Sequence, residues 1–158
     1  MPTSAPNMSK NDEAYISILN EIMETELAGV VKYTHYSLMI YGYNRIPIVD
    51  WMKGNATESL DHAHRAGEFV TLLGGHPSLK IGTLLETEQH DIGDILRESL
   101  QHEKHALNLY YKLLEAATEG GSVLLEEYAR EQIIAEESHL DEVNKMLRFP
   151  GQTQVFTG

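Results

Sequence analysis

The sequence predicts an all-α protein in which four helices form a bundle of two hairpins joined by one long crossover. Two observations carry this prediction. Apolar residues recur three and four positions apart along four long stretches, which is the period of one face of a helix. The prolines lie at the ends of these stretches or outside them, where they do not interrupt helical hydrogen bonds. They are Pro2, Pro6, Pro47, Pro77 and Pro150.

The first hairpin is expected to contain two long helices separated by a short turn. A helix over about 12–41 should end at Gly42, because glycine readily adopts the left-handed conformation that closes helices. A second helix over about 47–73 can begin at Pro47, since amides in the first turn of a helix have no helical partner to lose. The pair of glycines that follows should end this helix.

The second hairpin is expected after a connection over 76–88, which is long enough to cross the length of the bundle. A helix over 91–118 should be closed by the glycine pair at 120–121. The last helix should begin at Ser122 and end before Pro150.

The domain organisation follows from these elements. We expect one four-helix bundle over residues 12–149, a flexible N-terminal tail over 1–11 and a short C-terminal tail over 150–158. A chain of 158 residues can bury an ordinary core. The last segment is too short for a fifth helix.

Composition limits the classes of partner. The 24 acidic and 12 basic residues give a net charge of −12, which argues against nucleic acid, because phosphate binding depends on basic residues. No apolar run approaches the ~18 residues of a membrane helix, and the N-terminus lacks the pattern of a secretory signal. The chain has no cysteine, which excludes thiolate metal sites. We therefore expect a soluble, cytoplasmic protein with no membrane partner.

Acidic and histidine residues repeat in the two halves of the chain. Glu26 precedes His62 by 36 positions, and Glu103 precedes His139 by the same 36, with the two copies 77 positions apart. The second copy adds Glu136, three residues before its histidine. A four-helix bundle with one Glu on each of two helices and Glu-x-x-His on each of the others can build a two-metal carboxylate site.

These acidic positions fall on the stripes where apolar residues are expected. Carboxylates there would point into the bundle, where an uncompensated charge costs several kcal/mol, and a pair of divalent cations is the simplest compensation. Glu and His together suit iron or manganese, and zinc accepts the same ligands. Tyr33, two turns beyond Glu26, either lies within reach of the metals or is a core tyrosine. The predicted metal ligands so far are Glu26, His62, Glu103, Glu136 and His139.

The first copy of the repeat is imperfect, because Ser59 stands where its second carboxylate is expected. Residues three or four apart share a helix face, so Glu58 can partner His62. We prefer this pair to the alternative of Asp61 with His64. The remaining histidines are expected on the solvated surface, and they are His35, His76, His90, His102 and His105.

At these residues the chain resembles bacterioferritin and, more loosely, the wider ferritin superfamily. The corresponding residues are Glu26-Leu27, Tyr33, His62-Ala63, the corner from Leu73 to Pro77, Glu103 and the run from Glu136 to His139. The resemblance implies a ferritin-like bundle that binds two irons and oxidises Fe(II) with oxygen or peroxide, for iron storage or detoxification. It also implies that Glu26 and Glu103 are single-carboxylate ligands and that Glu136 is a bridge. Glu58 would then replace the missing bridge.

Three features depart from the family pattern. With Ser59 at a bridging position, the two metals should differ in affinity, and the one beside Glu103 and His139 should bind first. Leu60 occupies the place of the methionine that ligates haem in bacterioferritin, so we expect no haem. The absence of a fifth helix weakens the inference to a cage of about 24 subunits. We expect a homo-oligomer that is at least a dimer, with about 12 or 24 subunits as the larger alternatives.

Two other functions are alternatives to iron storage. A DNA-protecting mini-ferritin would assemble as a 12-mer, although the net charge of −12 argues against DNA contact. A non-storage oxidase or catalase with two irons or two manganese ions would need no hollow shell.

Overall fold

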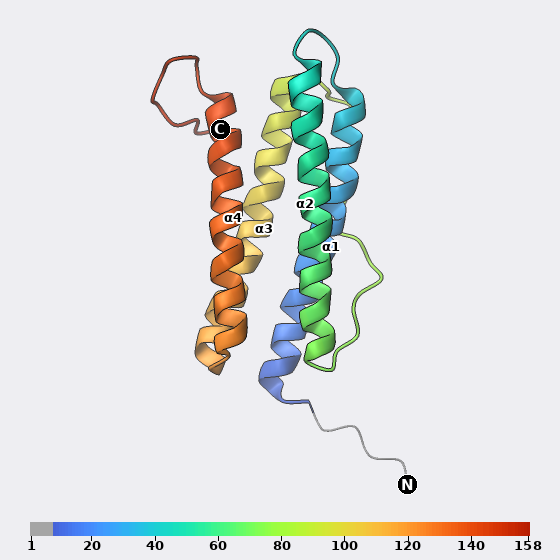
Figure 1. Ribbon diagram of the computed structural model, residues 1–158, viewed down its shortest axis with the longest axis vertical. Helices are drawn as coiled ribbons and strands as arrows, with labels where there is room; N and C mark the ends of the chain where they lie inside the picture. Colours follow the sequence, from blue (N-terminus) through green and yellow to red (C-terminus); the bar gives the residue numbers. More distant parts are fainter. Residues whose placement is uncertain (1–7) are drawn as a thin grey trace.

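The computed structural model describes residues 8–158, and the regular structure in that range is entirely helical (Figure 1). In chain order the helices are α1 (Lys10–Met39), α2 (Arg45–Leu72), α3 (Ile92–Gly120) and α4 (Val123–Leu147). The predicted all-α bundle of two hairpins and a long crossover is confirmed. Of the predicted N-terminal tail, residues 1–7 lie outside the described residues, and α1 begins at Lys10, two residues before the predicted start of the first helix.

Three helices are preceded by a residue whose side chain accepts a hydrogen bond from a backbone amide of the first turn. Such caps satisfy amides that have no helical partner. They are Ser9 for α1, Asp91 for α3 and Ser122 for α4, at 3.1, 3.0 and 3.3 Å. Local sequence therefore explains where these helices start.

The turn between α1 and α2 is held by Arg45. α2 begins at this residue, two positions before Pro47, and has no side-chain cap. The Arg45 guanidinium donates to the carbonyl of Ile40 at 2.6 Å and to that of Ser37 at 3.3 Å. These are carbonyls at the end of α1 that lack helical partners. One arginine thus closes the first helix while it opens the second.

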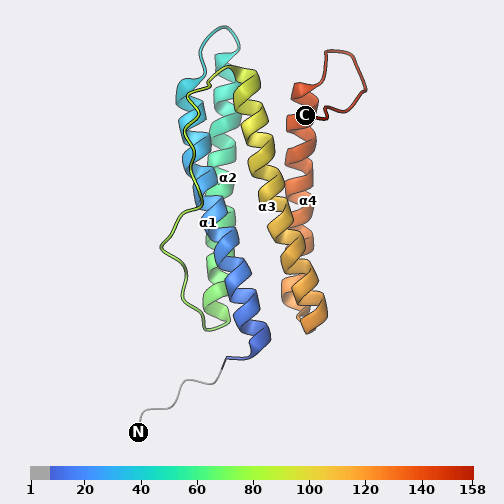
Figure 2. The same cartoon turned by 180° about the vertical axis from the view of Figure 1, so that it is seen from behind.

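The two hairpins pack on each other through α1 and α3. Figure 2 shows the crossover running along the outside of α1 before it reaches the start of α3. Hydrogen bonds hold it there, from the Gly82 amide to the Glu24 carbonyl at 2.8 Å and from the Ser78 amide to Asn20 Oδ1 at 2.9 Å. A Cβ on Gly82 would lie 3.1 Å from that carbonyl oxygen, so the close approach favours glycine.

The core consists of two apolar clusters. One contains Leu19 and Val70, and the other contains Met52 and Ile95. Between them, buried Glu and His side chains form a polar layer across the middle of the bundle. This layer divides what would otherwise be one continuous apolar core.

The segment after α4 folds back onto that helix. The Asn144 side chain donates to the Phe156 carbonyl at 2.9 Å and accepts from its amide at 3.3 Å. Residues 8–158 contain no fifth helix, as predicted. No helix in the described part of the chain is both long and apolar enough to span a membrane.

Replacement of Ser122 by alanine should destabilise the bundle by about 1 kcal/mol, because the first turn of α4 loses the oxygen that accepts from the Leu125 amide. Chemical denaturation followed by circular dichroism measures this change in the free energy of unfolding. Ser17→Ala, at an exposed position inside α1, is the control and should change it by less than about 0.5 kcal/mol. Equal effects of the two substitutions would contradict the capping role.

Candidate metal centre

The polar layer contains side chains from all four helices. Its three carboxylates are almost fully buried, with Glu136 only 1% exposed. Each lies three or four positions from apolar core residues of its own helix, and this spacing turns it inward. The members are Glu26 of α1, His62 of α2, Glu103 of α3, and Glu136 and His139 of α4.

One group of three converges around His62. Its Nδ1 atom lies 3.5 Å from Glu26 Oε1 and 3.3 Å from Glu136 Oε1. These ligand atoms lie close enough together to hold one metal ion. The group joins α1, α2 and α4.

A second group of three converges around Glu103. His139 Nδ1 lies 3.9 Å from Glu103 Oε2, and a carboxylate oxygen of Glu136 completes the group. Glu136 therefore belongs to both groups. Its Oε2 atom is buried without a hydrogen-bond partner, which is rare for a polar atom in a protein core.

Glu58 lies at the outer side of the layer, between the two histidines. One of its oxygens is 2.9 Å from His139 Nε2 and the other is 3.7 Å from His62 Nε2. The structure thus brings Glu58 to both groups. Asp61 and His64, the alternative pair, are both exposed and belong to neither group.

Two tyrosines bind the layer from opposite helices. The Tyr33 hydroxyl of α1 donates to Glu103 of α3, and the Tyr110 hydroxyl of α3 donates to Glu26 of α1 at 3.0 Å. Both phenol rings are fully buried. Each hairpin therefore supplies a hydrogen bond to the carboxylate of the other.

Tyr110 was missed by the sequence analysis, although the repeat contains the signal. Tyr33 follows Glu26 by seven positions, and Tyr110 follows Glu103 by the same seven. The 77-residue repeat thus extends to the tyrosines. Applied to Tyr33, it would have predicted Tyr110 as its counterpart.

Burial and hydrogen bonding shift the pKa values of the Glu and His side chains in this layer in different directions. Burial raises the pKa of Glu136 to about 10 and also raises that of Glu26. For Glu103, burial is outweighed by hydrogen bonds with Glu136, His139 and Tyr33, which lower its pKa. Burial likewise opposes the charge on His62, yet hydrogen bonds to Glu136 and Glu26 raise its pKa to about 10. Protons on Glu136 and His62 therefore partly compensate the acidic layer, and a divalent cation would displace them.

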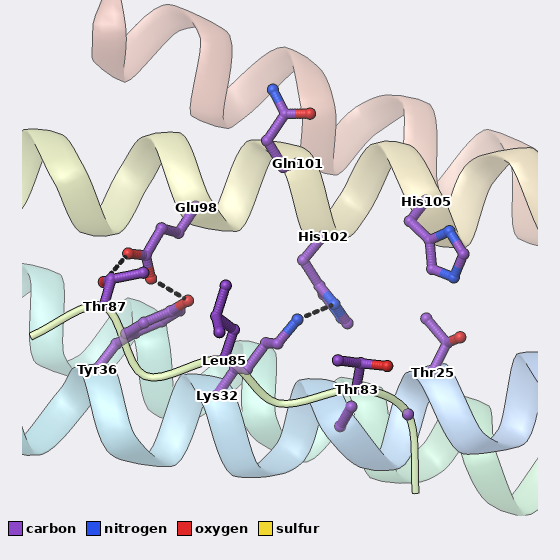
Figure 3. A pocket seen from close by; sticks show the side chains of 12 residues that line it. Thr25, Lys32, Tyr36, Thr83, Leu85, Thr87, Glu98, Gln101, His102 and His105 are labelled. Carbon is purple, nitrogen blue, oxygen red and sulfur yellow. Dashed lines mark hydrogen bonds between the residues drawn. The ribbon is translucent and has the colours of Figure 1, made fainter.

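The place of the missing carboxylate is tightly packed. Ser59 is buried, and a Cβ on Gly29 of α1 would lie 2.9 Å from its Oγ and 2.8 Å from His102 Nε2. The prediction that His102 lies on the solvated surface is therefore wrong. As Figure 3 shows, its Nδ1 faces Lys32 Nζ, at 3.4 Å. Burial lowers the pKa of His102 to about 4.

A four-helix bundle that carries Glu and His in its core is the architecture of the ferritin-like metal proteins. The chain belongs to the ferritin family, since the model of the ferritin-like domain matches residues 16–149. That range includes every residue of the polar layer. No curated protein sequence is significantly similar to the chain.

Solved structures show the same fold. The chain is 23% identical to ferritin-like, diiron-carboxylate proteins from Bacillus anthracis, with a TM-score of 0.84 over 89% of this chain and 100% of that one. Bacterioferritin from Desulfovibrio desulfuricans, whose diiron site is described in different catalytic states, is 25% identical with a TM-score of 0.78 over 90% and 83%. Bacterioferritin from Rhodobacter capsulatus is 22% identical with a TM-score of 0.78 over 84% and 82%.

Glu103→Gln and Glu136→Gln should differ in their effect on the metal-free protein. Glu103 is ionised and accepts hydrogen bonds, so its amide should destabilise the fold by about 1.5–3 kcal/mol, the range for hydrogen bonds to charged groups. Glu136 already carries a proton, so its amide should be nearly neutral. Denaturation of chelator-treated protein at neutral pH measures both. A larger loss for Glu136→Gln would contradict the opposite pKa shifts.

Proposed function

We propose that this protein binds two iron ions in the polar layer and oxidises Fe(II) with oxygen or peroxide, in iron storage or detoxification. The observation that carries the proposal is the position of Glu136, which is shared by two groups of potential ligands. Its buried, unpartnered Oε2 atom fits a missing cation, because protein cores rarely leave such an atom unsatisfied. Manganese and zinc suit the same ligand types.

The proposed ligands divide into two sets around Glu136. Glu26 and His62 would hold one ion, and Glu103 and His139 the other. Bound iron supplies the one-electron chemistry by which oxygen or peroxide is reduced. The protein fixes the ligand positions, and the apolar clusters on both sides of the layer exclude water.

Glu58 is proposed to replace the carboxylate that is absent at Ser59. Its two oxygens already face one histidine of each set, at 2.9 and 3.7 Å. The Glu58 side chain is 40% exposed and that of His139 is 21% exposed, whereas the carboxylates of the layer are buried. This supports access for Fe(II) from the side where α2 faces α4.

Tyr33 is proposed to take part in the reaction by holding a proton beside Glu103. Its hydroxyl donates to that carboxylate, and burial raises the pKa of Tyr33 well above its ordinary value. The phenol therefore stays protonated over the neutral pH range. It remains a hydrogen-bond donor to the Glu103 ligand.

We propose that the oligomeric state determines whether the protein stores iron or only oxidises Fe(II). Apolar side chains exposed on α1 and α2 support at least a dimer through these helices, and they include Val31, Leu38, Leu60 and Leu72. Leu60 offers no atom that ligates haem iron, which supports the expected absence of haem. An assembly mass of about 12 or 24 chains, measured by light scattering, would support a storage shell. A stable dimer would instead support an oxidase that stores no iron.

Glu136→Ala and His139→Ala should each abolish Fe(II) oxidation, because each removes a proposed ligand of the second set. Stopped-flow absorbance after mixing anaerobic Fe(II)-loaded protein with oxygen measures the rate, and metal analysis should give about two irons per wild-type chain. His64→Ala, at an exposed position of α2, is the control and should keep the wild-type rate. Full activity of either ligand variant would exclude this site.

Glu58→Ala should weaken metal binding by about tenfold or more, as loss of an orienting partner typically does. Asp61→Ala on the same helix is the matched control and should leave affinity unchanged. Anaerobic titration measures both and also tests for the two distinguishable binding steps expected from the loss of symmetry at Ser59. If Asp61→Ala weakened metal binding and Glu58→Ala did not, the metal ligands on α2 would instead be Asp61 and His64.

A further inference from the structure

A second cluster of potential metal ligands lies outside the polar layer, where the crossover passes α1. His35 Nε2 of α1 lies 3.1 Å from His90 Nε2 and 3.1 Å from Glu86 Oε2, both of which belong to the crossover. His90 Nε2 also lies 3.6 Å from Glu86 Oε1. The imidazoles expected on the solvated surface are thus half-buried and face each other.

The side chains of this cluster cannot all form hydrogen bonds with one another at the same time. One imidazole nitrogen carries either one hydrogen or one lone pair. Nε2 of His35 faces a nitrogen and a carboxylate oxygen at the same distance, so it can serve only one of them. A cation between the three side chains would accept a lone pair from each.

The spacing of these atoms fits a small first-row cation. Tetrahedral zinc with bonds of about 2.0–2.1 Å places its ligand atoms roughly 3.3 Å apart. The two separations of 3.1 Å from His35 Nε2, to His90 Nε2 and to Glu86 Oε2, lie close to that value, and His90 Nε2 lies 3.6 Å from the other Glu86 oxygen. Two histidines and one carboxylate also form a recurring ligand set for zinc and for Fe(II).

The crossover is shaped to present these ligands. Glu88, between Glu86 and His90, has a φ of 56°, which is uncommon for a residue other than glycine. Its amide donates to Glu86 Oε1 at 2.6 Å. Such an unusual backbone conformation persists only where the surroundings hold it in place, and here it lies between the two crossover residues that face His35.

Contacts with α3 hold the same segment from the other side. Figure 3 shows Glu98 of α3 accepting hydrogen bonds from Thr87 of the crossover and from Tyr36 of α1, the latter at 2.8 Å. Glu98, His35 and His90 also line a cavity of about 210 Å³ between the crossover and α1. The ligands therefore surround a partly enclosed space.

We propose that His35, Glu86 and His90 form a separate mononuclear site for a first-row divalent cation, which fastens the crossover to α1. His35 follows Glu26 by nine residues, or about 13 Å along the helix axis, so this site is distinct from the polar layer. It does not depend on the function proposed for that layer.

Zinc binding to the full-length protein tests the proposal. Equilibrium dialysis should show about one zinc per chain fewer for His90→Gln and for Glu86→Gln than for wild type, since each removes one of three ligands. His64→Gln, at an exposed position of α2, is the control and should bind the wild-type amount. The comparison between variants removes the contribution of zinc bound in the polar layer.

Hydrogen exchange supplies a second readout. Zinc should slow amide exchange over residues 84–91 in wild type and in His64→Gln, but not in His35→Gln. Circular dichroism establishes that each variant is folded. Zinc stoichiometry that is the same in His90→Gln and His64→Gln, or unchanged exchange of the crossover in wild type, would overturn the proposal.

Discussion

Three carboxyl groups are buried across the middle of the bundle, where no solvent stabilises their charge. Glu26, Glu103 and Glu136 occupy positions where a bundle of this length would otherwise place apolar side chains. Moving such groups from water into a core is costly unless they are paired or bound to a cation. The layer therefore forms only because each helix supplies a partner to it.

The apolar clusters on either side of the layer stabilise the bundle and so offset the cost of burying these carboxyl groups. They fix the four helices at both ends, so the ligand positions between them cannot relax apart. The crossover and the caps have a different role, because they determine where the helices begin and which hairpin lies next to which. Chain connectivity thus brings together two half-sites that are far apart in sequence.

The fold was predictable from the sequence because its signals are local and repeated. Apolar periodicity, proline positions and glycine pairs located all four helices within two residues of their observed ends. The inward positions of Glu26, Glu103 and Glu136 also followed from helical spacing. Periodicity assigns a residue to a face, however, and says little about neighbours across the bundle.

Other features could not be predicted for that reason. His102 is buried because Gly29 and Ser59, on two other helices, leave room for its ring. The meeting of His35 with His90 depends on the path of the crossover, whose conformation includes the unusual backbone of Glu88. Such contacts arise from tertiary packing and leave no periodic pattern in the chain.

The crossed tyrosine hydrogen bonds have a consequence for how the molecule opens. Because Tyr33 and Tyr110 each bind a carboxylate of the opposite hairpin, neither hairpin can separate without leaving buried groups of both unsatisfied. The middle of the bundle should therefore unfold as one cooperative unit, while fraying is confined to helix ends and loops. A centre assembled from two internal copies thus joins them into a single folding unit.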